Sequence, residues 1–97
     1  MPSSDPVNPP ILEPDQNRLV VTAQDSILWN GTKVSEAQAL AALRLVETRV
    51  PEPETQIAPE AGASYEKTAR LMRLVDVSGV TKVGFVGNER YRNFERD

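Results

Sequence analysis

Two residue types that carry much of enzyme chemistry are missing from this 97-residue sequence, which contains no cysteine and no histidine. Without cysteine there is no disulfide, no thiolate nucleophile and no thiolate metal ligand. Without histidine the usual general base and the commonest metal ligand are also missing. These absences exclude most hydrolytic triads and zinc sites. They leave the compartment undecided, because an oxidising space permits disulfides without requiring them.

The sequence also lacks a basic excess and a long apolar run. Its 11 basic and 14 acidic residues give a net charge of −3, whereas binding to a phosphate backbone requires a basic surface. We therefore expect no nucleic-acid partner. No apolar run approaches the roughly 20 residues that cross a bilayer, and residues 1–10 do not have the features of a signal peptide. The chain is either cytosolic or the soluble part of a longer protein.

Proline divides the chain into a linker and a domain. Residues 1–17 contain five of the eight prolines and three acidic residues, with no basic residue. Proline removes amide donors and fixes φ, so we expect a flexible, acidic, proline-rich linker over residues 1–17. A single small domain is expected over residues 18–87. Residues 88–97 are expected to form a C-terminal tail.

Short β-branched segments and turn residues predict the strands. Asp25 and Ser26 form a predicted turn, and Asn30 with Gly31 is the strongest short hairpin signal, since both residues accept positive φ. Gly84 and Gly87 have the spacing of a phosphate-gripping GxxG loop, but bulky apolar residues stand between them, which favours a strand. The expected strands are residues 19–23, 27–29, 32–34, 55–58 and 80–86.

Two helices are predicted between these strands. Ser35 and Gln38 fit a capping box at the start of the first helix, which Pro51 ends. Ser64 caps the second helix, and Gly79 ends it. The expected buried faces are Ala37, Leu40, Ala41, Leu43 and Val50 in the first helix, and Tyr65, Thr68, Leu71, Met72 and Val75 in the second. The fold class is therefore α+β: a two-layer sandwich with two helices on one face of a small mixed β-sheet of four to five strands.

Few residues remain as candidates for chemistry. Glu52, Glu54 and Glu60 are either paired carboxylates for acid–base work or a solvated rim. Arg70 and Arg73 lie one turn apart and either grip an anion together or form a solvated face. Trp29, the single tryptophan, is either a core residue or an interface anchor, and we favour the core. No enzyme, cofactor or metal site is predicted.

Several motifs occur together in this order. WNG at residues 29–31 precedes a short strand, and VS at residues 34–35 opens a helix. Tyr65 starts the next helix, and VTKVGFVG follows at residues 80–87. Together these motifs resemble the periplasmic domain of the ExbD/TolR family, and VNPP at residues 7–10 resembles the linker that follows the membrane helix in ExbD-type members.

The resemblance covers residues 19–89 and has two departures. The family's membrane helix, with the aspartate implicated in proton flow, is absent from the chain. Residues 58–61, APEA, stand where the family commonly has an Arg/Ala/Asp/Lys-like run.

The resemblance implies a function. The chain would be the periplasmic domain of a single-pass subunit in the bacterial inner membrane, working with an ExbB-like or TolQ-like membrane subunit and forming a homodimer in the complex. That complex uses the proton motive force to energise a TonB-like or TolA-like periplasmic protein for outer-membrane transport. Residues 82–89 favour the ExbD-like branch over a TolR-like subunit of the Tol–Pal envelope-maintenance system. An unrelated interaction module and a small enzyme of ferredoxin-like build are the other hypotheses.

A small sheet must expose edges, and an exposed edge accepts an extended peptide as an added strand. Because the first strand adjoins the linker, we expect the partner to bind there. The expected partner-binding residues are Leu19, Val20, Val21, Thr22 and Ala23 in that strand and Val7, Asn8 and Pro9 in the linker.

Overall fold

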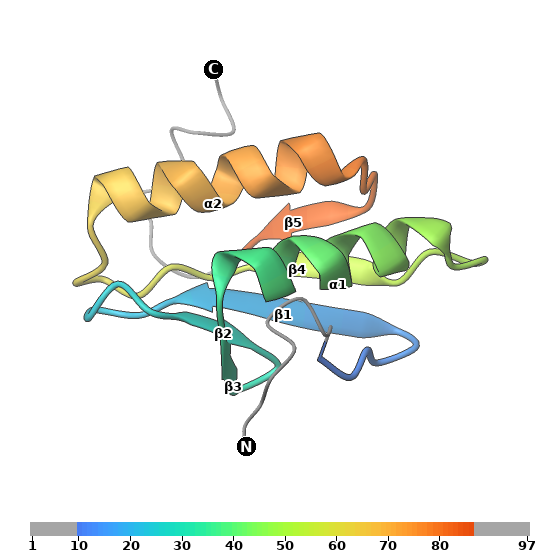
Figure 1. Ribbon diagram of the computed structural model, residues 1–97, viewed down its shortest axis with the longest axis horizontal. Helices are drawn as coiled ribbons and strands as arrows, with labels where there is room; N and C mark the ends of the chain where they lie inside the picture. Colours follow the sequence, from blue (N-terminus) through green and yellow to red (C-terminus); the bar gives the residue numbers. More distant parts are fainter. Residues whose placement is uncertain (1–9, 87–97) are drawn as a thin grey trace.

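Two helices lie side by side across one face of a five-stranded sheet in the computed structural model, which describes residues 10–86 (Figure 1). This arrangement confirms the predicted α+β two-layer sandwich. The strands are β1 (Gln16–Val21), β2 (Ile27–Trp29), β3 (Thr32–Val34), β4 (Glu54–Ile57) and β5 (Val83–Phe85), and the helices are α1 (Glu36–Thr48) and α2 (Tyr65–Ser78).

The order of the strands across the sheet is β3-β2-β1-β4-β5. The first three strands are antiparallel neighbours, whereas β4 is parallel to both β1 and β5. The two helical connections, β3 to β4 and β4 to β5, therefore join parallel strands and step across the sheet in the same direction. Since such connections are almost always right-handed, both helices are placed on the same face.

The predicted turns and caps form as expected. Asn30 and Gly31 have φ values of 51° and 88° in the hairpin between β2 and β3. In the capping box of α1, the Gln38 amide donates to Ser35 Oγ at 3.0 Å, and the Ser35 amide donates to Gln38 Oε1 at 2.9 Å. Ser64 caps α2 through the amide of Lys67, at 3.0 Å. Gly79 ends α2 in the left-handed region with φ 88°, which only glycine adopts without strain.

The core lies between the sheet and the helices. Alternate side chains of β1 point inward, so that Asn17, Leu19 and Val21 are buried. Trp29 on β2 is buried as predicted, with 1% of its surface exposed. It is therefore a core residue in the domain.

The predicted buried face of α1 is largely wrong. The buried residues are Ala39, Ala42, Leu43 and Val46, and Leu43 alone belongs to the expected set. Val50 lies beyond the end of the helix and is 96% exposed. The alanines of this helix lie on several of its sides, so its apolar residues fit more than one stripe. Contact with the sheet decides which stripe is buried. In α2 the expected face is buried at Thr68, Leu71 and Val75, whereas Tyr65, in the first turn, is 68% exposed.

Two predicted boundaries are also wrong. β1 begins at Gln16, so the expected linker end at residue 17 falls within the central strand, where Asn17 pairs with Thr55. β5 covers three residues rather than residues 80–86. Thr81 and Lys82 donate backbone hydrogen bonds to a glutamate side chain instead, which delays the start of the strand.

Candidate interaction site

The segment predicted to bind a partner does not lie at an edge of the sheet. Leu19, Val20 and Val21 belong to β1, which is the central strand, with β2 on one side and β4 on the other. The predicted edge position is therefore wrong, because the chain returns after α1 and pairs β4 with the free side of β1. The linker residues Val7, Asn8 and Pro9 lie outside the described residues.

Backbone groups around this segment already have partners within the domain. The carbonyls of Leu19 and Val21 accept hydrogen bonds from the amides of Ala58 and Glu60, each at 2.9 Å. The amide of Ala23 donates to the Glu60 carboxylate at 2.8 Å. A peptide adding here as a strand would have to displace these bonds.

The two edges of the sheet belong to β3 and β5. In β5, the hydrogen bonds toward β4 come from alternate positions: Lys82 O accepts from Thr55 N at 2.8 Å, and Val86 N donates to Ile57 O at 2.9 Å. The amide of Val83 therefore points away from β4. Val83 is 38% exposed, and within residues 10–86 no strand pairs with the outer side of β5. This edge has the geometry that strand addition needs.

A single carboxylate holds the backbone where the chain enters β5. Glu52, in the loop before β4, accepts hydrogen bonds from the Thr81 amide at 2.8 Å, the Lys82 amide at 3.0 Å and the Thr81 hydroxyl at 3.0 Å. The hydrogen bond from the Lys82 amide is the largest cause of a lowered Glu52 pKa, and the Thr81 bonds and the charge of Lys82 add to it. All of them favour the ionised carboxylate. We call this contact the Glu52 clamp.

The other predicted carboxylates also hold the fold. Glu54 accepts a hydrogen bond from the Gln16 side chain at 3.2 Å. Glu60 binds the Ala23 amide beyond the far end of β4. Because Glu52 and Glu60 flank opposite ends of one strand, the three carboxylates do not form a single acid–base cluster. No group of three or more acidic side chains within residues 10–86 is placed to hold a metal ion.

The predicted pair of arginines on α2 does not form a free anion site. Arg70 and Lys67 both bind the carboxylate of Glu36 on α1, each at 3.0 Å. The hydrogen bond from Arg70 is the largest cause of a lowered Glu36 pKa, followed by that from Lys67. These contacts join the two helices, and Arg70 is therefore engaged within the domain.

Residues 11–15, which we call the strap, are bound to the domain ahead of β1. The indole Nε1 of Trp29 donates a hydrogen bond to Ile11 O at 3.1 Å. The Asn17 side chain binds both backbone groups of Glu13, accepting from its amide at 2.7 Å and donating to its carbonyl at 3.1 Å. Leu12 is half-buried and packs against the core. Sequence reasoning missed the strap because its proline content indicated a flexible linker.

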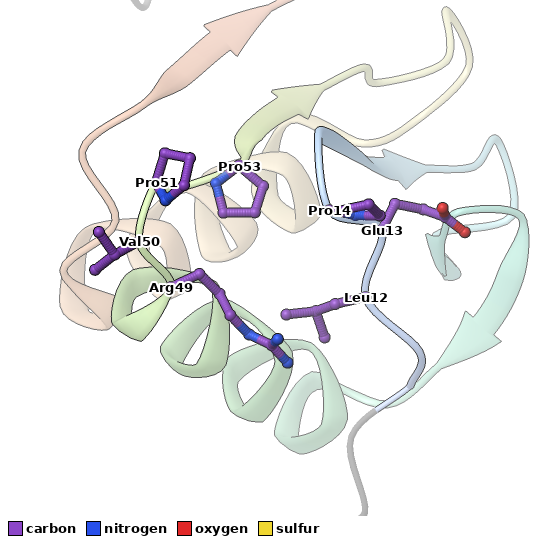
Figure 2. A pocket seen from close by; sticks show the side chains of 7 residues that line it. All are labelled: Leu12, Glu13, Pro14, Arg49, Val50, Pro51 and Pro53. Carbon is purple, nitrogen blue, oxygen red and sulfur yellow. The ribbon is translucent and has the colours of Figure 1, made fainter.

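A shallow pocket lies between the strap and the loop that joins α1 to β4. Figure 2 shows the Leu12 side chain on one side, facing α1, and the Arg49 side chain extending from the end of that helix. The volume is about 240 Å³, and the wall is formed by Leu12, Glu13, Pro14, Arg49, Val50, Pro51 and Pro53. The strap thus forms one side of this pocket.

The fold and the site together define a class: a small α+β domain whose ionised side chains join its own loops and helices and whose sheet ends in short edge strands. No helix among residues 10–86 has the length and apolarity needed to cross a membrane.

The chain belongs to the ExbD/TolR family. The family model described as biopolymer transport protein ExbD/TolR matches residues 1–89. No curated protein matches the chain significantly.

Proposed function

We propose that this chain is the periplasmic domain of a single-pass inner-membrane subunit that transmits proton-motive-force energy to the outer membrane. The observation that carries the proposal is the family match over residues 1–89. The two-layer fold with its short edge strand supports a role in binding rather than catalysis. An ExbB-like or TolQ-like membrane subunit and a TonB-like or TolA-like periplasmic protein are the expected partners, with a homodimer in the complex.

The domain acts without a catalytic set of its own. The sequence has neither cysteine nor histidine, and Glu52, Glu54 and Glu60 accept hydrogen bonds that hold the domain together. Transmission of force requires contacts that form and break, which the edge of a sheet supplies.

The proposed branch is the ExbD-like one, which serves outer-membrane transport, because of the residues KVGFVGNE at positions 82–89. The TolR-like branch, which maintains the envelope, is the alternative. Deletion of the gene in its own host distinguishes them. An ExbD-like subunit predicts loss of ferric-siderophore uptake, restored by the intact gene. A TolR-like subunit predicts detergent sensitivity and leakage of periplasmic proteins with normal uptake. If the deletion strain shows neither of these two phenotypes, the energy-transducing role is contradicted.

The partner peptide is proposed to add as a strand at the outer edge of β5. This site replaces the predicted site at residues 19–23, because β1 is paired on both sides whereas Val83 directs its amide outward. Contacts of the preceding linker, at Val7, Asn8 and Pro9, remain part of the proposal. A second copy of the chain is the competing occupant of the edge.

A matched pair of proline variants tests this site. Proline at Val83 removes an outward amide of β5 while leaving the pairing with β4. Proline at Lys33 does the same on the opposite edge, because the pairing of Trp29 with Thr32 around the hairpin turn leaves the Lys33 amide pointing outward. Circular dichroism first establishes that both variants fold.

The labelled chain is then titrated with overlapping synthetic peptides from the TonB-like and TolA-like proteins of the same genome. We expect Val83→Pro to weaken peptide binding at least tenfold and Lys33→Pro to leave it unchanged. Undiminished binding by a folded Val83→Pro variant would refute addition at β5. A change from monomer to dimer that depends on Val83 would assign the edge to a second copy.

A further inference from the structure

The strap is held mainly through its backbone, by two buried side chains of the domain. Trp29 and Asn17 are 1% and 0% exposed, and their polar groups bind Ile11 O and the amide and carbonyl of Glu13. Asn17 Oδ1 also accepts a hydrogen bond from the Asn30 side chain at 2.9 Å, so the turn between β2 and β3 belongs to the same network. The strap therefore docks at specific atoms.

The strap's own side chains add little to this attachment. Ile11 is 84% exposed, and Pro14 and Asp15 are exposed as well. Leu12 alone packs against the core. A segment held by a few hydrogen bonds and one apolar side chain has a low local stability compared with a paired central strand. Asp15 O accepts a hydrogen bond from the amide of Glu54 on β4 at 3.0 Å, so the last strap residue is attached to the sheet. Water can replace the bonds at Ile11 and Glu13, so residues 11–14 can leave without disturbing the sheet.

The position of the strap matters because it lies between the N-terminal segment and β1. β1 is the central strand and pairs with both β2 and β4. A pull on the N-terminal segment acts first on the bonds at Ile11 and Glu13, and it reaches Gln16 only after they open.

We propose that the strap is a releasable latch in the N-terminal tether. Under load residues 11–14 open before the sheet and lengthen the tether, while Asp15 stays attached to β4 and the domain stays folded. The four freed residues span at most about 13 Å at roughly 3.3 Å per residue, and the length gained is this extended length minus the distance that the bound segment already spans. This role of the latch rests on the proposed function, in which the N-terminal side leads to the membrane.

Hydrogen exchange of the full chain tests whether the latch opens independently. The chain has one tryptophan, so its indole N–H gives a single NMR signal that reports on the bond to Ile11. We expect this N–H and the Glu13 amide to exchange at matching opening frequencies, at least a hundredfold more often than the amide of Val20 in the middle of β1. Exchange of all three only through global unfolding would overturn the proposal, as would a complete lack of protection at Glu13.

Two neighbouring substitutions supply a matched comparison. Leu12→Ala removes the strap's apolar contact, and we expect about a tenfold faster exchange of Glu13 and the Trp29 indole, with that of Val20 unchanged. Ile11→Ala removes an exposed side chain of the same size and should change none of them. Equal effects of the two substitutions would contradict the latch, since packing at Leu12 would then play no part.

A pulling experiment tests the mechanical part separately. The chain has no cysteine, so an introduced cysteine at exposed Val77 and the N-terminus give two defined attachment points. We expect a reversible extension step of less than about 13 Å below the unfolding force. In Leu12→Ala this step should occur at a lower force. Unfolding in one step without it would overturn the load-bearing role. Both measurements use the isolated chain, so their outcome does not depend on the deletion phenotypes that test the proposed function.

Discussion

Two segments enter the sheet at the same end, and they are held by different chemistry. The strap leads into β1 and is bound by the uncharged side chains of Trp29 and Asn17, both buried. The chain entering β5 is bound by the half-buried, ionised Glu52. Asp15 at the end of the strap and Lys82 before β5 line one shared hollow, so the two entering segments are close in space.

Both attachments hold a chain segment where it enters the sheet, but their stability responds to different changes. Buried neutral groups are costly to leave unpaired and do not titrate, whereas a carboxylate near the surface is screened by water and responds to pH. We expect the strap attachment to be sensitive to substitution and the Glu52 clamp to be sensitive to acid.

The largest expected effect is that of Asn17→Ala, which breaks the strap attachment. It removes the hydrogen bonds of Asn17 to Glu13 and to the Asn30 side chain and opens space in a fully buried position. We expect a loss of about 2–4 kcal/mol in the free energy of unfolding, measured by urea melts. Gln24→Ala, at an exposed position, is the control. A loss below about 1 kcal/mol would mean that Asn17 adds little to the attachment.

A smaller effect is expected at Gly79, just before the Glu52 clamp. With φ at 88°, a β-branched residue is strained, although a Cβ would meet only the Glu47 side chain, with Cγ at 3.5 Å and Cδ at 3.9 Å, which are ordinary contacts. Gly79→Val should therefore destabilise the domain by about 1–2 kcal/mol in urea melts through backbone strain. Gly79→Asn, which tolerates this conformation better, should lose less. Equal losses would point to a steric cause instead.

Glu52→Gln should reveal the pH dependence of the clamp. In the folded state the hydrogen bonds lower the pKa of Glu52 from 4.5. The ionised carboxylate therefore stabilises the fold at pH values above the unfolded-state pKa. This stabilisation is lost as the pH falls through the lower folded-state pKa. We expect the variant to be less stable by about 1 kcal/mol at pH 7, since the site is partly solvated.

The measurement is a pair of denaturation series, for the intact chain and for Glu52→Gln, between pH 3 and pH 7. The difference between them should shrink below the ordinary glutamate pKa of 4.5. Over the same pH range, the difference in unfolding free energy between the intact chain and Trp29→Phe should stay constant. The hydrogen bond to Ile11 contains no titrating group, although the strap also carries Glu13 and Asp15 and packs near Arg49. A constant difference for Glu52→Gln would contradict the clamp.

The smallest expected effect has the opposite sign. The hydroxyl of Thr55, fully buried on β4 beside Asn17, has no hydrogen-bond partner within the described residues. Thr55→Val keeps the shape and removes the unpaired hydroxyl, so it should stabilise the domain by about 0.5–1 kcal/mol in thermal or urea melts. Destabilisation would show that the hydroxyl has a hydrogen-bond partner in solution.

Much of the fold could be predicted because its signals are local. The hairpin at Asn30 and Gly31 depends on two residues that accept positive φ, and the caps at Ser35 and Ser64 join groups three residues apart. Such bonds are largely specified by neighbouring residues. The class of fold followed from the order of these elements.

The candidate site could not be predicted in the same way. The sequence marks Leu19, Val20 and Val21 as a strand, but their neighbours are chosen only when β4, more than 30 residues later, pairs with β1. The apolar stripe of α1 was ambiguous for the same reason. A residue pattern specifies which face of an element is apolar, whereas the partner depends on the path of the whole chain.

The sequence by itself therefore determined the elements, their turns and caps, and the two-layer α+β class, because neighbouring residues control backbone conformation. Only the tertiary structure decided that β1 is central, that β5 is an edge and that the strap is bound. The contacts responsible join Trp29 to Ile11 across 18 residues and Glu52 to Thr81 across 29. They form because folding brings distant polar groups together where each needs a partner.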